Sequence, residues 1–199
     1  MIKFLLGLVL LLPVKSFALL TVLDTGEIIE SGKYKLGIQL QGITDEPGGI
    51  NFAGHVYLPI NSAWNLRLHA GTGQTEFNAG GGVKWIPIPD INHQPAIGAI
   101  MEVEWASDNN FDVLYTRFAP LISKSFRWEY GAMSPYAAIP IGIYYMLDAD
   151  HDKTDIFLQL ALGVELDLEA FDNFTIVGEG GFDLKDSFSY VSIMGRFTF

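Results

Sequence analysis

The residues best suited to metal or acid–base chemistry lie in one acidic loop over 148–155, which reads Asp-Ala-Asp-His-Asp-Lys-Thr-Asp. Carboxylates at alternate positions are how a calcium loop presents its oxygen ligands. The acidic candidates are Asp148, Asp150, Asp152 and Asp155. A calcium loop also needs a turn glycine and a glutamate at its twelfth position, whereas this loop has Lys153 and Gln159 there. An aspartate–histidine protease site around His151 lacks a facing aspartate pair. We therefore interpret the segment as a solvated acidic loop and expect no metal site and no cofactor.

Hydrolysis by a nucleophilic side chain needs a serine or cysteine held next to a histidine. The chain has no cysteine. His55 is followed by Val56 and Tyr57, and no serine is close to it. His69 is followed by Ala70 and Gly71, again without a serine. We therefore assign no catalytic residue and expect no enzyme activity, while a hydrolase site assembled from separate strands stays open as an alternative.

Charged residues of both signs recur at alternate positions inside otherwise apolar stretches. Five are basic and five acidic, so that this face of the strands sums to zero: Lys35, Arg67, Glu76, Lys84, Glu102, Glu104, Arg117, Glu165, Glu179 and Arg196. They could line a path for ions, or they could pair with one another and fill a closed interior. We favour the second reading, because buried charges need partners.

The elements that carry these charges are predicted to be β-strands. Over 156–166 every second residue is apolar, while Gln159, Gly163 and Glu165 lie between them. A period of two over nine to eleven residues is typical of a strand with unlike faces, at the length a tilted strand needs to cross a bilayer. Ten such segments are expected: 33–44, 50–60, 64–73, 75–86, 96–106, 112–124, 134–147, 154–167, 174–183 and 188–199. The predicted fold is an all-β, antiparallel up-and-down transmembrane barrel of about ten strands, with 8 to 12 open.

Three prolines interrupt the strand pattern: Pro59, Pro120 and Pro140. Proline cannot donate a hydrogen bond to a neighbouring strand. We expect bulges or strand ends at these positions, and a connection over Ser125–Met133.

The alternation also suits a soluble, lipocalin-like barrel that turns its apolar face inward to bind an apolar ligand. The aromatic residues favour the membrane reading, because bilayer interfaces select amphipathic rings. One group of rings falls at the predicted periplasmic rim: Trp64, Trp85, Phe174, Phe197 and Phe199. A second group falls toward the opposite rim: Phe52, Phe77, Trp105 and Tyr145.

The first eighteen residues have the features of a secretory signal peptide. Lys3 supplies a positive charge, Phe4–Leu12 is an apolar run too short to span a bilayer, and Ser16 and Ala18 are small residues at the −3 and −1 positions of a cleavage site. We expect cleavage after Ala18, a short periplasmic lead-in over 19–32, and a barrel over 33–199.

The charge of the remaining chain excludes nucleic acid as a partner. Without Lys3 and Lys15 it keeps 10 basic against 23 acidic residues, a net charge of −13. Phosphate binding requires a basic surface. The absence of cysteine also means that an exported fold must be stable without disulfides.

The last strand ends the chain on an aromatic residue, with apolar side chains at alternate positions before it. This pattern resembles the C-terminal signal of Gram-negative outer-membrane barrels, and the general pattern is similar to small barrels of the OmpA, OmpW and OmpX type. The matching residues are Tyr190 or Val191, then Ile193, Gly195, Phe197 and Phe199. The resemblance implies an outer-membrane location and recognition by the barrel-assembly machinery. We expect a monomer that contacts outer-membrane lipids and lipopolysaccharide, with a structural or narrow-pore role for small solutes or ions.

Overall fold

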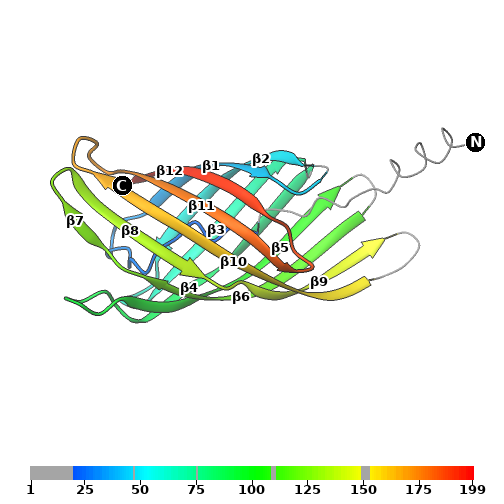
Figure 1. Ribbon diagram of the computed structural model, residues 1–199, viewed down its shortest axis with the longest axis horizontal. Helices are drawn as coiled ribbons and strands as arrows, with labels where there is room; N and C mark the ends of the chain where they lie inside the picture. Colours follow the sequence, from blue (N-terminus) through cyan, green and yellow to red (C-terminus); the bar gives the residue numbers. More distant parts are fainter. Residues whose placement is uncertain (1–19, 47, 75, 109–110, 149–152) are drawn as a thin grey trace, which may run out of the picture.

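The computed structural model describes residues 20–46, 48–74, 76–108, 111–148 and 153–199. These residues form an antiparallel sheet that closes on itself (Figure 1). The strands are β1 (Lys35–Ile43), β2 (Gly49–Pro59), β3 (Trp64–Gly73), β4 (Phe77–Ile88), β5 (Ala96–Asp108), β6 (Phe111–Ser123), β7 (Phe126–Trp128), β8 (Gly131–Ala138), β9 (Ile141–Asp148), β10 (Lys153–Leu168), β11 (Phe174–Lys185) and β12 (Tyr190–Thr198). Within the described ranges, no helix is both long and apolar enough to cross a membrane.

The twelve strand segments make a barrel wall of ten strands. β8 and β9 lie end to end and together occupy one strand position between β6 and β10. β7 pairs with β8 alone among the named strands. β1 pairs with β2 on one side and with β12 on the other, so that the first and last strands close the ring. The predicted ten-stranded, up-and-down barrel is confirmed.

The hairpin of β7 and β8 was predicted as an irregular connection, and that part of the prediction is wrong. β7 continues β6 after a break at Lys124 and Ser125, and its three residues pair with the start of β8. The aromatic side chains Phe126, Trp128 and Tyr130 of this hairpin are exposed. The β6–β8 wall therefore reaches further at this end of the barrel than the sequence pattern suggests.

The prolines behave in two ways. Pro59 is the last residue of β2, and Pro140 lies in the break between β8 and β9, as expected. Pro120 lies inside β6, against the prediction. Its carbonyl accepts a hydrogen bond from the amide of Ile139 at 3.1 Å. Because the N–H and C=O of one residue in an antiparallel strand point to the same neighbour, the missing N–H of Pro120 faces the β8–β9 break, where the ladder is already interrupted.

The apolar side chains face outward and the charged ones inward. On β1, Ile38 is 77% exposed and its neighbour Gln39 is 0% exposed. On β12, Ile193 is 52% exposed and Arg196 is 1% exposed. A soluble ligand-binding barrel has the reverse arrangement, and an Arg or Lys facing lipid would cost about 2–4 kcal/mol at the middle of a bilayer. The barrel is therefore of the membrane-spanning type.

The aromatic rings meet in pairs at the two rims, as predicted. Trp64 and Trp85, on neighbouring strands, stack with their ring centroids 5.6 Å apart at the end of the barrel where the C-terminus lies. The rings of Phe174 and Phe197 are 4.6 Å apart at the same end. Phe77 and Trp105 lie 5.8 Å apart near the opposite end.

Candidate functional site

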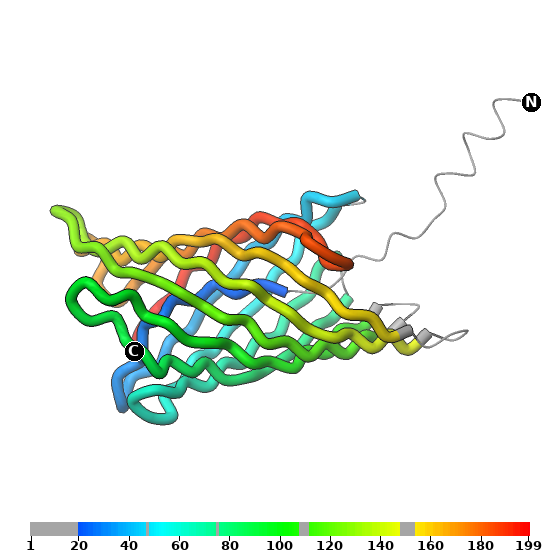
Figure 2. The backbone as a smooth tube through the Cα atoms, turned by 60° about the horizontal axis from the view of Figure 1, so that its bottom comes forward, coloured from blue at the N-terminus to red at the C-terminus, as the bar shows by residue number. Residues whose placement is uncertain are grey.

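The N-terminal segment, residues 20–29, lies inside the barrel. The sequence predicts a periplasmic lead-in there, over 19–32. Residues 20–25 are all at most 2% exposed. The segment enters from the end where Tyr34 stacks on Phe199, and runs back along the interior (Figure 2). At its inner end Leu20 packs in a cluster with Ile43, the last residue of β1, and with Phe188, in the connection between β11 and β12. The lumen is therefore occupied by the chain itself.

The segment pairs with no strand, so its backbone groups take partners from the wall. The amides of Val22 and Leu23 donate to the two carboxylate oxygens of Glu179, at 2.8 and 2.7 Å. Arg67 donates through Nη2 to the carbonyl of Val22 at 2.8 Å, and Arg117 through Nη2 to that of Thr21 at 2.6 Å. Buried backbone groups must be paired, and charged wall residues meet that requirement here.

Nearer the mouth, Lys84 and Ser123 hold the same segment. Lys84 Nζ donates to the carbonyls of Thr25 and Glu27, at 3.0 and 2.6 Å. The amide of Gly26 donates to the hydroxyl of Ser123 at 2.8 Å. Contacts from separate strands therefore fix the segment along its length.

Asp24 gives this segment a buried charge of its own. Its carboxylate lies 2.8 Å from Lys84 Nζ, 3.6 Å from Arg196 Nη1 and 3.8 Å from Arg67 Nη1. Asp24 is not among the predicted lumen residues, because it lies outside every alternating stretch. One acidic group at the centre of three cations ties the segment to β3, β4 and β12.

The predicted lumen charges are brought together, with one exception. Glu76 is exposed, because it lies in the turn before β4 begins at Phe77 and its side chain does not enter the lumen. The other nine predicted residues are buried. Asp24 replaces Glu76 in the count, so the buried charges among the described residues are again five basic and five acidic.

Most of these buried charges form a network across the wall. Glu102 lies 3.2 Å from Nε of Arg67 and also binds Arg117. Arg196 binds Glu165 at 2.5 Å. The guanidinium groups of Arg67 and Arg196 lie 5.6 and 5.5 Å from the ring centre of Tyr57, so that each makes a cation–π contact with that ring. The pairing predicted from charge balance is thus found in the lumen.

Glu179 is satisfied without a basic side chain. The hydroxyls of Tyr136 and Tyr190 donate to it at 2.7 and 2.6 Å, in addition to the two backbone amides of the N-terminal segment. Tyr190 is one of the two residues expected to begin the assembly signal. It faces the lumen, whereas Val191 is 63% exposed on the outer face with Ile193, Phe197 and Phe199.

Two histidines, His55 and His69, lie side by side in the lumen. His55 Nε2 is 2.6 Å from the amide oxygen of Gln39, and the rings of His55 and His69 are 5.6 Å apart. His69 Nε2 lies 3.5 Å from the carboxylate of Glu104. Among the described residues no serine hydroxyl is hydrogen-bonded to either histidine.

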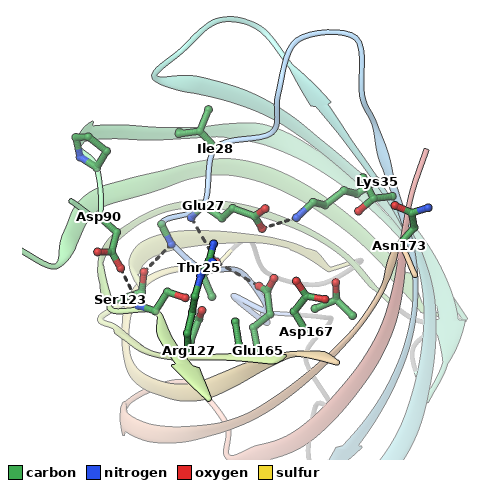
Figure 3. Close-up of a pocket in the computed structure, with 17 residues that line it drawn as sticks. Thr25, Glu27, Ile28, Lys35, Asp90, Ser123, Arg127, Glu165, Asp167 and Asn173 are labelled. Atoms are coloured by element: carbon green, nitrogen blue, oxygen red, sulfur yellow. Dashed lines mark hydrogen bonds and ion pairs between the residues drawn. The ribbon is translucent and has the colours of Figure 1, made fainter. Parts of the chain in front are cut away.

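A polar cavity of about 500 Å³ opens at the end of the barrel where the C-terminus lies (Figure 3). Part of its lining is the segment Thr25–Ile28, and the wall around it contributes Arg127, Glu165 and Asp167. Lys35, also in the lining, pairs with Glu27 of the segment. The cavity is a vestibule whose inner side is formed by the N-terminal segment.

Asp90 braces the rim of this vestibule. It accepts a hydrogen bond from the amide of Ser125 at 2.7 Å and pairs with Lys124. Partial burial by itself would raise the pKa of Asp90, but the hydrogen bonds from Lys124 and Ser125 outweigh it and hold the pKa below its ordinary value. The turn after β4 is thereby joined to the start of the β7–β8 hairpin.

Two predicted sites fall wholly or partly outside the described residues. Ala18 is one of them. The candidate cation loop is the other, since Asp150 and Asp152 and the side chain of Asp148 are not described, and Asp155 alone remains. Across the described ranges, no group of three or more histidine, aspartate or glutamate side chains is placed to hold a metal ion.

Comparison with protein-family models and with curated proteins gave no match. Among solved structures, the N-terminal β-barrel domain of Pseudomonas aeruginosa OprF is similar with 10% identity, over 84% of this chain and 97% of that chain, at a TM-score of 0.39. The translocator domain of the autotransporter NalP from Neisseria meningitidis is similar with 6% identity, over 84% and 86%, at 0.46. Ail, the attachment invasion locus protein of Yersinia pestis, is similar with 11% identity, over 84% and 97%, at 0.35.

Proposed function

We propose that this chain is an outer-membrane β-barrel protein with a structural or narrow-pore role, and that its own N-terminal segment closes the lumen. The observation that carries the proposal is the placement of residues 20–25 inside the barrel, bound to charged side chains of the wall. The residue types alone allow either an open ion path or a filled interior. The occupied lumen supports the filled interior as the resting state.

Size and charge both support closure. Barrels near eight strands are filled by side chains, and water channels belong to much wider ones. With ten strands, this barrel is close in size to those whose interior is filled by side chains. An ion that crossed the lumen would have to displace Asp24 from its three cations, or Glu102 from Arg67 and Arg117. Breaking such a buried pair is strongly unfavourable.

Planar-bilayer conductance tests the closed lumen. The refolded protein should give no steady current, whereas Asp24→Asn should open at least about tenfold more often, because a loss of about 1.4 kcal/mol at the Asp24 contacts already changes an equilibrium tenfold. Asp172→Asn, in an exposed turn, is the matched control and should behave as the parent protein. A parent protein that conducts steadily would overturn the closed resting state.

The outer-membrane location rests on the apolar outer face, the two aromatic rims and the C-terminal strand. Fractionation of cells that make the full chain should recover it with outer membranes, and the folded form should shift its gel mobility on heating. Recovery as a soluble protein without detergent would contradict the location.

We also propose that the barrel has no hydrolase activity. His55 is held by Gln39, and His69 lies against Glu104, so neither ring is paired with a hydroxyl that it could activate. The opposite proposal is an outer-membrane lipid or peptide hydrolase. Among the described residues, no histidine paired with a hydroxyl supports it.

A further inference from the structure

Most charged side chains of the vestibule are already paired within the protein. The pairs are Glu27 with Lys35, Asp90 with Lys124, and Glu165 with Arg196. Arg127 and Asp167 complete the charged lining (Figure 3). In the part of the chain that the structure describes, neither of these two side chains has an ion-pair or hydrogen-bond partner. The vestibule therefore keeps one free positive charge and one free negative charge.

The two free charges lie on either side of one small residue of the wall. Asp167 on β10 is the direct neighbour of Ala132 on β8, and Ala132 is the direct neighbour of Arg127 on β7. Directly opposed residues of an antiparallel sheet turn their side chains to the same face. Adjacent strands lie about 4.8 Å apart, so the Cα atoms of Arg127 and Asp167 are separated by about 10 Å. Because Ala132 has only a methyl group, the space between the two charges is part of the cavity.

Hydroxyl groups lie next to the two charges. Thr175 on β11 is the direct partner of Asp167 and is 6% exposed. Ser134 lies on β8, two residues after Ala132. Both residues line the cavity, and within the described ranges neither hydroxyl makes a hydrogen bond. These hydroxyls are therefore available to a molecule that enters the vestibule.

We infer that the vestibule binds a small zwitterion, whose carboxylate is held by Arg127 and whose ammonium group is held by Asp167. A guanidinium binds a carboxylate through two parallel hydrogen bonds, and a carboxylate accepts charge-assisted hydrogen bonds from an ammonium. Free amino acids and dipeptides carry these two groups at opposite ends. An extended chain of two residues spans at most about 7 Å, which is compatible with the gap between the two side chains. The cavity volume of about 500 Å³ is within the range of small-molecule sites.

The arrangement of charge disfavours a ligand with a single charge. An anion bound to Arg127 would lie close to the carboxylates of Asp167 and Glu165, and a cation bound to Asp167 would lie close to Arg127. A neutral ligand would leave both charges without partners. A zwitterion satisfies both at once. Its binding requires no passage through the lumen, because the inner side of the vestibule is the N-terminal segment itself.

Calorimetric titration of the refolded protein in detergent micelles tests the inference, at low ionic strength, where exposed charges are least screened. Alanine and the dipeptide alanyl-alanine are the two zwitterionic probes, and their comparison shows which length the site takes. Each probe is compared with its N-acetyl form, which lacks the ammonium group, and with its C-terminal amide, which lacks the carboxylate. At least one zwitterion should bind saturably. Both of its blocked forms should bind at least about tenfold more weakly, because each lacks one charge-assisted hydrogen-bonding group.

Two substitutions assign the two ends of the ligand separately. In Arg127→Gln, the amide should bind as well as the zwitterion, because no cation is left to distinguish them, while the N-acetyl form should still bind more weakly. Asp167→Asn should show the reverse preference. Lys185→Gln and Asp172→Asn, at exposed positions outside the cavity lining, are the matched controls and should keep both preferences. Heat-modifiable gel mobility checks that each variant is folded.

Loss of all measurable binding in Arg127→Gln and Asp167→Asn, with binding intact in both controls, would also support the site. Three results would overturn the inference: no saturable binding of either zwitterion, blocked forms that bind the parent protein as tightly as the zwitterion, or unchanged preferences in both vestibule variants. The readout is binding and not conductance, so failure of the closed-lumen proposal would be seen separately.

Discussion

Replacing Glu102 with alanine is expected to lower the free energy of unfolding by about 3–5 kcal/mol. The side chain is 4% exposed and binds both Arg67 and Arg117. Removing it leaves two guanidinium groups in the lumen without their shared anion, and breaking a buried pair from one side has a cost of this size. The loss can be measured by urea unfolding of the protein in detergent micelles or lipid vesicles, followed by tryptophan fluorescence.

Two variants calibrate that measurement. Glu169→Ala removes an exposed carboxylate from the connection between β10 and β11 and should change stability by less than about 0.5 kcal/mol. Glu102→Gln keeps a hydrogen-bonding group, so its free energy of unfolding should lie between those of the parent and the alanine variant. If Glu102→Ala costs no more than Glu169→Ala, the buried network does not contribute to stability as described.

Gly163→Ala is expected to destabilise the barrel by about 1–3 kcal/mol, through overpacking. A Cβ atom at Gly163 would lie 2.2 Å from Cζ of Tyr136. The ring cannot move away freely, because it is 4% exposed and its hydroxyl donates to Glu179. Since Glu179 accepts from the amides of the N-terminal segment, a displaced Tyr136 should also loosen that segment.

The matched control is Gly178→Ala on β11, where an added Cβ has no atom within 4 Å. It should leave stability within about 0.5 kcal/mol of the parent. Amide hydrogen exchange of Val22 and Leu23 reports on the segment and should become faster in Gly163→Ala only. Unchanged exchange in both variants would show that Tyr136 does not support the seat of the segment.

The strands and the inward face of most charges are predictable from the sequence because their cause is local. A period of two decides on its own which side chains share a face, so that Arg67 and Lys84 are assigned to the lumen without knowledge of the ring. The prediction that Glu76 faces the lumen is wrong because this residue lies one position before β4, where the alternation no longer fixes the direction of a side chain. Tyr190 begins β12, and its neighbour Val191 takes the outward position.

The position of the N-terminal segment depends on contacts distant in sequence, and no local pattern signals it. Val22 meets Glu179, and Thr21 meets Arg117, across separations of 157 and 96 residues. Asp24 follows an apolar run without alternation, as a lead-in segment would. Only the structure excludes Glu76; without it the wall carries five basic and four acidic buried residues, and Asp24 supplies the fifth acidic group.

The closure of β1 onto β12 sets the order in which the molecule can be assembled. A segment that runs lengthwise inside a closed ring cannot pass sideways between hydrogen-bonded strands. Residues 20–29 must therefore be in place before the seam between the first and last strands is complete, or must later slide in along the axis from the end near Tyr34. Withdrawal from the finished barrel is limited to the same axial route. A factor that binds the polypeptide between the segment and β1 could withdraw the segment along the axis and open the lumen while the ring of strands stays closed.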